Sequence, residues 1–137
     1  MSTLPAITVS SLDYARLSAL IDRTPAKEVP GVTALEAELE RADVLEPAEM
    51  PAGVITMNSR ATVRDEANGE VRTLTLVYPQ DADLAAGKIS ILAPVGSALL
   101  GLSVGQAIDW PLPTGGTTRL VVLSVDWQPE AAGELTL

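Results

Sequence analysis

The hydrophobic pattern of this 137-residue chain changes near residue 50, and this change constrains the fold more than any other feature. Before residue 50, apolar residues recur at three- and four-residue steps, as they do along one face of an α-helix. After it, short segments alternate apolar and polar residues between glycines and prolines, a pattern typical of β-strands. Helices and strands that occupy separate blocks of a chain predict an α+β fold.

Residues 10–49 predict two amphipathic helices. Ser10 and Asp13 have the spacing of a capping box at the start of the first helix, and Thr33 is expected to cap the second. The prolines and the glycine in residues 24–31 predict a loop between them. Each helix has about 13 residues and therefore a length of roughly 20 Å. We expect a short antiparallel hairpin, a small coiled coil that forms an N-terminal domain of residues 1–50.

Residues 51–137 predict a second domain, a mostly antiparallel sheet crossed by one short helix at residues 94–100. The expected strands are residues 53–57, 60–66, 70–78, 88–92, 106–112 and 118–127. Asn68-Gly69 predicts a hairpin turn, and residues 130–137 are expected to be loose. The last strand reads as a central strand, with one face expected to carry Val121, Leu123, Val125 and Trp127.

Composition excludes several classes of activity. The chain has no Cys and no His, so it lacks the residues of disulfides, zinc ribbons, Ser-His-Asp triads and HExxH sites. Its 18 acidic and 9 basic residues give a formal net charge of −9. Because nucleic acids and anionic membranes are bound by clustered Lys and Arg, we expect no direct binding of DNA, RNA or membranes. A signal peptide and long apolar segments are also absent from the sequence, so we expect a cytoplasmic protein.

Three segments have a ligand-binding interpretation and a simpler one. The acidic residues 36, 40 and 43 share a face of the second helix and could form a metal site. However, charge runs on amphipathic helices usually face solvent. Asp81 and Asp83 form a possible carboxylate pair, although the cap of a short turn explains them better. Residues 94–105 are rich in glycine but lack the GxxxxGK[ST] pattern of a phosphate loop. We therefore predict no metal site and no cofactor, and a tightly packed short helix at residues 94–100.

The same glycine-rich segment carries a family resemblance. Residues 91–105, with the core Pro94-Val95-Gly96-Ser97-Ala98-Leu99-Leu100-Gly101, resemble the C-terminal signature of the Gre-type transcript cleavage factors. Residues 57–60, 76–79 and 128–133 add motifs that resemble those of the Rnk proteins, the regulators of nucleoside diphosphate kinase. The resemblance implies an FKBP-like sheet domain that follows a short helical hairpin.

The resemblance also implies RNA polymerase as the partner. Gre factors dock their globular domain at the rim of the polymerase secondary channel and insert their hairpin into the channel. By this resemblance we expect docking through Pro94, Val95 and Ser97. Residues 98–100 are expected in the core, because so short a helix must bury one face.

The tip of the predicted hairpin departs from the Gre pattern. Gre factors carry an acidic DLSEN-like motif there, which helps to hold a magnesium ion at the polymerase active site and promotes cleavage of backtracked RNA. Here the tip has Asp22, Lys27 and Glu28, and that motif is absent. The predicted hairpin is also several turns shorter, whereas a carboxylate must come within about 2.5 Å of its ion. We therefore do not expect transcript cleavage.

Together these features predict a non-enzymatic, monomeric regulator that binds RNA polymerase near the secondary channel and competes with Gre-type factors. An effect on nucleoside diphosphate kinase would be indirect, because such kinases use a catalytic His and this chain has none. Prolyl isomerase activity is not expected, since 2 Tyr, 2 Trp and no Phe are few for an aromatic pocket. Two alternatives stay open: a cleavage-stimulating elongation factor with a remodelled acidic tip, and an interaction domain unrelated to polymerase.

Overall fold

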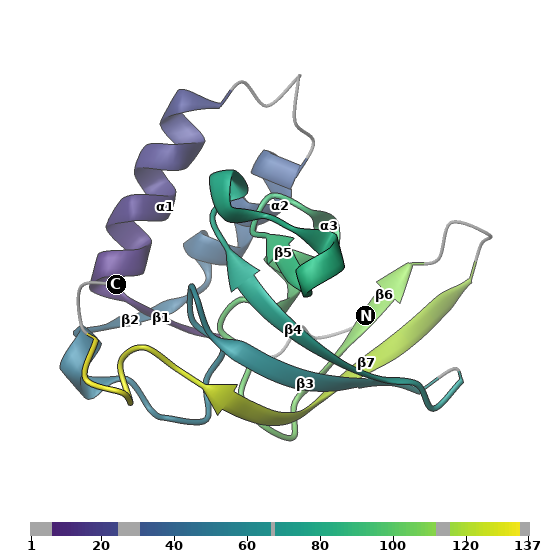
Figure 1. Cartoon of the computed structure of the whole chain (residues 1–137). Coiled ribbons are helices and arrows are strands. Elements are labelled where there is room, and N and C mark those ends of the chain that lie inside the picture. The colour runs from purple at the N-terminus through teal and green to yellow at the C-terminus, as the bar shows by residue number, and fades with distance from the viewer. Residues whose placement is uncertain (1–6, 25–30, 67, 112–115, 135–137) are drawn as a thin grey trace.

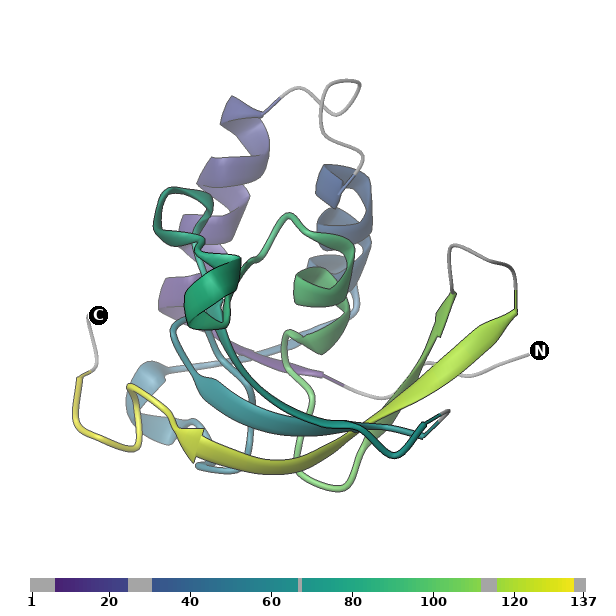
Figure 2. The same ribbon diagram turned by 45° about the vertical axis from the view of Figure 1, so that its right-hand side comes forward.

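The computed structural model of the protein describes residues 7–24, 31–66, 68–111 and 116–134. Helices α1, α2 and α3 lie on one side of a curled five-stranded sheet (Figure 1 and Figure 2). Within the described ranges, no helix covers the opposite side of the sheet. The arrangement is the mixed α+β architecture that the separated periodicities predicted.

Helix α1 (Ser11–Arg23) begins where the sequence predicted, because the Ser10 hydroxyl accepts a hydrogen bond from the Asp13 backbone N–H at 3.0 Å. Helix α2 (Gly31–Glu40) begins earlier than predicted, so the prediction of Thr33 as its cap is wrong. The additional turn contains Val32, whose side chain is buried, and this burial stabilises the earlier start. With 10 residues, α2 is about 15 Å long, shorter than expected.

Two strands that the sequence did not predict join the ends of these helices. Strand β1 (Thr8–Ser10) pairs in parallel with β2 (Asp43–Leu45), so the chain before α1 lies beside the chain after α2. Each strand has only three residues. Such a strand is too short to show a period of two in the sequence.

The main sheet contains β3 (Arg60–Asp65), β4 (Val71–Val77), β5 (Lys88–Ser90), β6 (Ala107–Pro111) and β7 (Thr117–Trp127), in the order β5-β4-β3-β7-β6. All neighbours are antiparallel except β4 and β5, which are parallel. Strand β7 has a neighbour on each side, as predicted for a central strand. The predicted strand at 53–57 does not form; its backbone makes an isolated bridge at Val54, and the chain turns at Asn58 with a φ of 67°.

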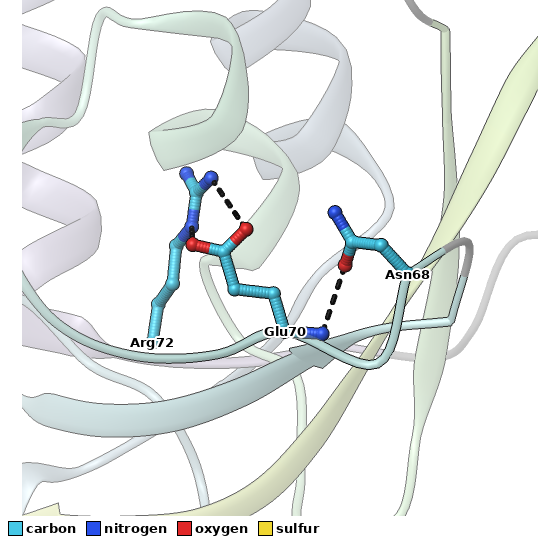
Figure 3. A network of polar contacts seen from close by, with 3 residues as sticks. All are labelled: Asn68, Glu70 and Arg72. Carbon is cyan, nitrogen blue, oxygen red and sulfur yellow. Dashed lines mark hydrogen bonds and ion pairs between the residues drawn. The ribbon is translucent and has the colours of Figure 1, made fainter.

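The turn between β3 and β4 lies where Asn68-Gly69 predicted it. Gly69 has a positive φ of 73°, and the Asn68 side-chain oxygen accepts a hydrogen bond from the Glu70 backbone N–H at 2.8 Å (Figure 3). Two nitrogens of Arg72 contact the Glu70 carboxylate at 3.2 and 3.3 Å (Figure 3). The turn is longer than a two-residue loop, because the Asp65 backbone N–H bonds to the Glu70 carbonyl.

Strand β7 contains irregularities that change which side chains face the core. Its register against β3 shifts twice, once on each side of the pairs Ala61–Val125 and Thr62–Ser124. An extra residue in a strand reverses the alternation beyond it. Val125 therefore packs against the core with Val122, whereas Leu123 and Trp127 are exposed. The prediction that Val121, Leu123, Val125 and Trp127 share one face is wrong.

The remaining short elements are α3 (Pro94–Leu99) and the 3-10 turns η1 (Pro47–Glu49), η2 (Pro79–Asp81) and η3 (Leu84–Ala86). The Asp83 carboxylate accepts hydrogen bonds from the backbone N–H groups of Ala85 at 3.1 Å and Ala86 at 3.4 Å. This is the capping role that the sequence predicted for Asp83.

Helices and sheet share one hydrophobic core. Leu17 and Leu20 of α1 and Leu35 and Leu39 of α2 belong to the same buried cluster as the sheet residues. Both sides of the predicted boundary at residue 50 thus contribute to one cluster, and the division into two domains stays a prediction.

The described part of the C-terminal segment, to residue 134, is held by hydrogen bonds, contrary to the prediction of a loose tail, while residues 135–137 of that prediction lie outside the described residues. The buried side-chain amide of Gln128 donates hydrogen bonds to the carbonyls of Pro51 and Val54, both at 2.8 Å. The backbone N–H of Glu134 donates to the Pro129 carbonyl, also at 2.8 Å. These bonds stabilise the segment to residue 134.

Candidate functional site

The predicted docking helix α3 is mainly a core element. Residues 98–100 are buried, as predicted. Ser97 is only 3% exposed, so the prediction that it contributes to an accessible docking surface is wrong. Pro94 begins the helix, as its missing N–H favours. The side chains of Pro94 and Val95 lie outside the described part of the structure, and their role in docking stays a prediction.

Two glycines explain why α3 packs so closely against its neighbours that its described side chains are buried. A Cβ atom at Gly96 would lie 2.1 Å from the Ser90 carbonyl oxygen. A Cβ atom at Gly101, where φ is 81°, would lie 2.6 Å from the Cβ of Ile7. Only glycine permits such close backbone approach. The glycine-rich signature therefore lets α3 and the residues after it pack directly on β5 and β1, and Ser97 is buried with its neighbours.

Of the predicted tip residues, Asp22 is exposed in the last turn of α1, while Lys27 and Glu28 lie outside the described residues. Asp22, Glu36 and Glu40 line a groove between α1 and α2, together with the apolar side chains of Ile21 and Leu39. The described ranges contain no group of three or more acidic residues placed to hold a metal ion. Glu36 and Glu40 are exposed, in agreement with the solvent-facing interpretation.

A buried carboxylate at the other end of α1 was not predicted as a site residue. Asp13 is 3% exposed, and its side chain accepts a hydrogen bond from the Met57 backbone N–H at 3.1 Å. Burial raises the pKa of Asp13 from 3.8 to about 6, and the negative charge of Glu130 acts in the same direction. The bond from Met57 opposes this rise because it stabilises the charged form. Asp13 thus connects the start of α1 to the segment before β3.

Thr56 and Ser59 extend this polar region to the C-terminal segment. The Thr56 hydroxyl lies 2.7 Å from the Ser59 hydroxyl and donates to the Glu130 carboxylate at 2.8 Å. The Ser59 hydroxyl also accepts the Thr56 backbone N–H at 2.9 Å. Because hydrogen bonds offset the cost of burying polar groups, these contacts fix Glu130 close to Asp13.

Tyr78 borders the same region from the end of β4. Burial, followed by the charge of Asp13, raises the pKa of Tyr78 to about 12, so its hydroxyl stays protonated at neutral pH. The hydroxyl oxygen is buried and makes no hydrogen bond of normal geometry, although the positive charge of Arg16 is near enough to oppose the rise in its pKa.

We name Asp13, Thr56, Ser59, Tyr78 and Glu130 the α1 junction cluster. It brings together three segments that the sequence marked as motifs, residues 57–60, 76–79 and 128–133, and adds the cap of α1. The only signal for Asp13 in the sequence is its capping-box spacing, because Met57 and Glu130 are 44 or more residues away. The cluster orients α1 on the sheet and the C-terminal segment.

Comparison with known proteins agrees with this architecture. Residues 50–126 match the family model of the C-terminal part of the transcription elongation factors GreA/GreB, and residues 5–45 match that of the Rnk N-terminus. The regulator of nucleoside diphosphate kinase of Escherichia coli K12 is 47% identical over 97% of this chain and 98% of its own length. GreA of Sinorhizobium medicae is 34% identical over 70% of this chain but only 60% of its own length.

A solved structure supports the same relationship. The transcription elongation factor GreA/GreB from Nitrosomonas europaea is 50% identical, with a TM-score of 0.74, and the match covers 90% of this chain and 99% of that one. The fold therefore belongs to the class of Gre-like α+β proteins. Within that class, the chain belongs to the Rnk family, the regulators of nucleoside diphosphate kinase. No helix in the described ranges is long and apolar enough to cross a membrane.

Proposed function

We propose that this protein is a non-enzymatic transcription regulator that binds RNA polymerase near the secondary channel and competes there with Gre-type factors. The observation that carries this proposal is a Gre-like C-terminal region joined to helices of only 13 and 10 residues. An influence on nucleoside diphosphate kinase, named in its relative, would then act through transcription. A cytoplasmic, monomeric protein without cofactors is part of the same proposal.

The lengths of the helices favour competition over transcript cleavage. In this proposal α1 and α2 form a short coiled-coil hairpin on an FKBP-like domain. At 1.5 Å per residue, α1 extends only about 20 Å from its start at the junction cluster. An acidic group at such a tip can occupy the mouth of a channel without delivering a metal ligand deep inside it. The exposed acids Asp22, Glu36 and Glu40 favour a basic channel wall by charge complementarity.

A competition experiment tests the proposal. Fluorescently labelled protein is bound to core RNA polymerase, and unlabelled GreA is then titrated. We expect GreA to displace the labelled protein completely, and the unlabelled protein to displace labelled GreA in the reverse experiment. Simultaneous binding of both proteins, or no binding of this protein to polymerase, would defeat the proposal.

A second experiment distinguishes the proposed competition from the alternative function, stimulation of transcript cleavage. The protein is added to a backtracked elongation complex with labelled RNA, with GreA as the positive control. We expect the RNA to keep its length. RNA shortening that is lost in Asp22→Ala or Glu28→Ala, but kept in the control Asp81→Ala, would establish the alternative. Asp81 suits the control because it is exposed and lies in η2.

A further inference from the structure

One surface hollow combines positive charge from α1 with polar groups from the sheet. It is lined by Arg16, Ala19 and Arg23 of α1 and by Tyr78 and Gln80 from the connection after β4. The α1 residues follow at steps of three and four, so they lie on one face of the helix, with a small side chain between the two arginines. Among the described residues, none that lines this hollow is acidic.

The hollow gathers two arginines in a chain with a formal net charge of −9. Four described arginines outside it contact carboxylates directly, in the pairs Arg41–Glu38, Arg64–Glu66, Arg72–Glu70 and Arg119–Asp109. Within the described residues, Arg23 has no such partner, and its side chain is exposed. Arg16 acts partly on the junction cluster, where its charge lowers the pKa of Asp13.

The kinds of donor in the hollow indicate the chemistry of its ligand. A guanidinium group offers five N–H donors in a planar fork, which matches the oxygens of phosphate, and a Gln amide adds two more. Arg16 and Arg23 are seven residues apart, so their Cα atoms are separated by about 10 Å along the helix. Two long side chains at this spacing can contact two linked phosphate groups from opposite ends. A ligand with a single carboxylate has only two oxygens to accept hydrogen bonds from both arginines.

We infer that this hollow binds a small anion with linked phosphate groups, held by Arg16 and Arg23 of α1 and by Gln80 of the sheet domain. The acidic groove formed by Asp22, Glu36 and Glu40 is a separate surface. Screening reduces the effect of charges farther away than about 8–10 Å at physiological salt. Such a ligand contacts both the helix and the sheet domain, so its binding stabilises their association.

Pyrophosphate is a suitable probe, and the experiment uses the whole chain without polymerase, so that its outcome is independent of the proposed regulatory function. Amide chemical shifts are followed by NMR during titration with pyrophosphate. We expect saturable changes in residues 16–23 and 78–80, which weaken as NaCl is added. Arg23→Gln and Gln80→Ala alter exposed residues and should preserve the fold, while Arg23→Gln weakens binding about fivefold.

The control is Arg60→Gln, which removes the same charge from an exposed position on β3, outside the hollow. This variant should bind pyrophosphate like the unmodified protein. Equal weakening by Arg60→Gln and Arg23→Gln would show a general charge effect and overturn the inference. It is also overturned if the shifts do not saturate, or if they map to residues away from the hollow.

Discussion

At the scale of single residues, Asp13 gives the protein a specific dependence of stability on pH. Its pKa is raised from 3.8 to about 6, mainly by burial, so between these pH values the folded state holds a proton that the unfolded chain has released. The stabilising contribution of this group is therefore complete below about pH 4 and is lost as the pH rises through about 6. A difference of roughly two pKa units corresponds to about 3 kcal/mol.

Asp13→Asn tests this dependence, because an amide oxygen can still accept the hydrogen bond from Met57 while the charge is removed. We expect the variant to be more stable than the unmodified protein by about 3 kcal/mol at pH 7.5, and the difference to vanish near pH 4. Urea unfolding at a series of pH values measures it. The control is Asp22→Asn, an exposed change of the same kind on the same helix. A difference that is constant with pH would contradict the assignment.

Gly96 supports a second prediction at this scale. A Cβ atom there would meet the Ser90 backbone oxygen at 2.1 Å, and a backbone atom in a sheet cannot move aside as a flexible side chain can. We expect Gly96→Ala to lower the free energy of unfolding by about 3 kcal/mol. The matched control is Gly53→Ala, whose Cβ would lie 3.7 Å from Val104, an ordinary contact. Equal stability of the two variants in urea would contradict the close approach.

Asp13 and Gly96 show which features of a residue can be predicted from the sequence and which cannot. The spacing of Ser10 and Asp13 predicts a helix cap correctly, but it gives no sign that Met57 and Glu130 approach Asp13 from distant parts of the chain. The glycines of residues 94–105 predict close packing, but only the structure shows that the packing buries Ser97. Local pattern thus identifies the residue type that a position requires, whereas the distant contact partner depends on the tertiary fold.

At the scale of elements, the sequence predicts the existence of a strand better than the phase of its side chains. Strand β7 was expected to be central, and it is. The predicted alternation of its side chains is wrong, because register shifts on both sides of Val125 turn that side chain to the opposite face of the strand. The parallel pair β1 and β2 gave no periodic signal at all, since each has three residues. Both failures come from long-range pairing, which a local period cannot report.

The start of α1 offers a prediction at the element scale. The Ser10 hydroxyl satisfies one of the free N–H groups at the helix start. Ser10→Ala should therefore lower the free energy of unfolding by about 1 kcal/mol. Ser18→Ala, in the middle of the same helix, should leave stability unchanged or raise it by about 0.5 kcal/mol, because Ala has the higher helix propensity. Chemical unfolding followed by circular dichroism compares them, and equal losses would contradict the capping role.

At the scale of the whole molecule, the charged side chains form separate surface regions, whereas the apolar side chains form one continuous core. The surface groove between α1 and α2 is acidic, the hollow on the other face of α1 carries two arginines, and the two carboxylates of the junction cluster lie beside that hollow, since Tyr78 belongs to both. Underneath, one apolar cluster joins both helices to the sheet. The helices are therefore held by packing rather than by their own propensity, because isolated helices of 13 and 10 residues are marginal in water.

This shared core predicts that helices and sheet unfold together. Circular dichroism at 222 nm reports mainly on α1 and α2, and the fluorescence of Trp110 and Trp127 reports on β6 and β7. The two signals should give coincident urea transitions. Leu17→Ala removes an α1 side chain from the core and should shift both transitions equally, by about 2–5 kcal/mol. If residues 1–50 instead formed an independent domain, Leu17→Ala would shift only the helical signal, and the two transitions would separate.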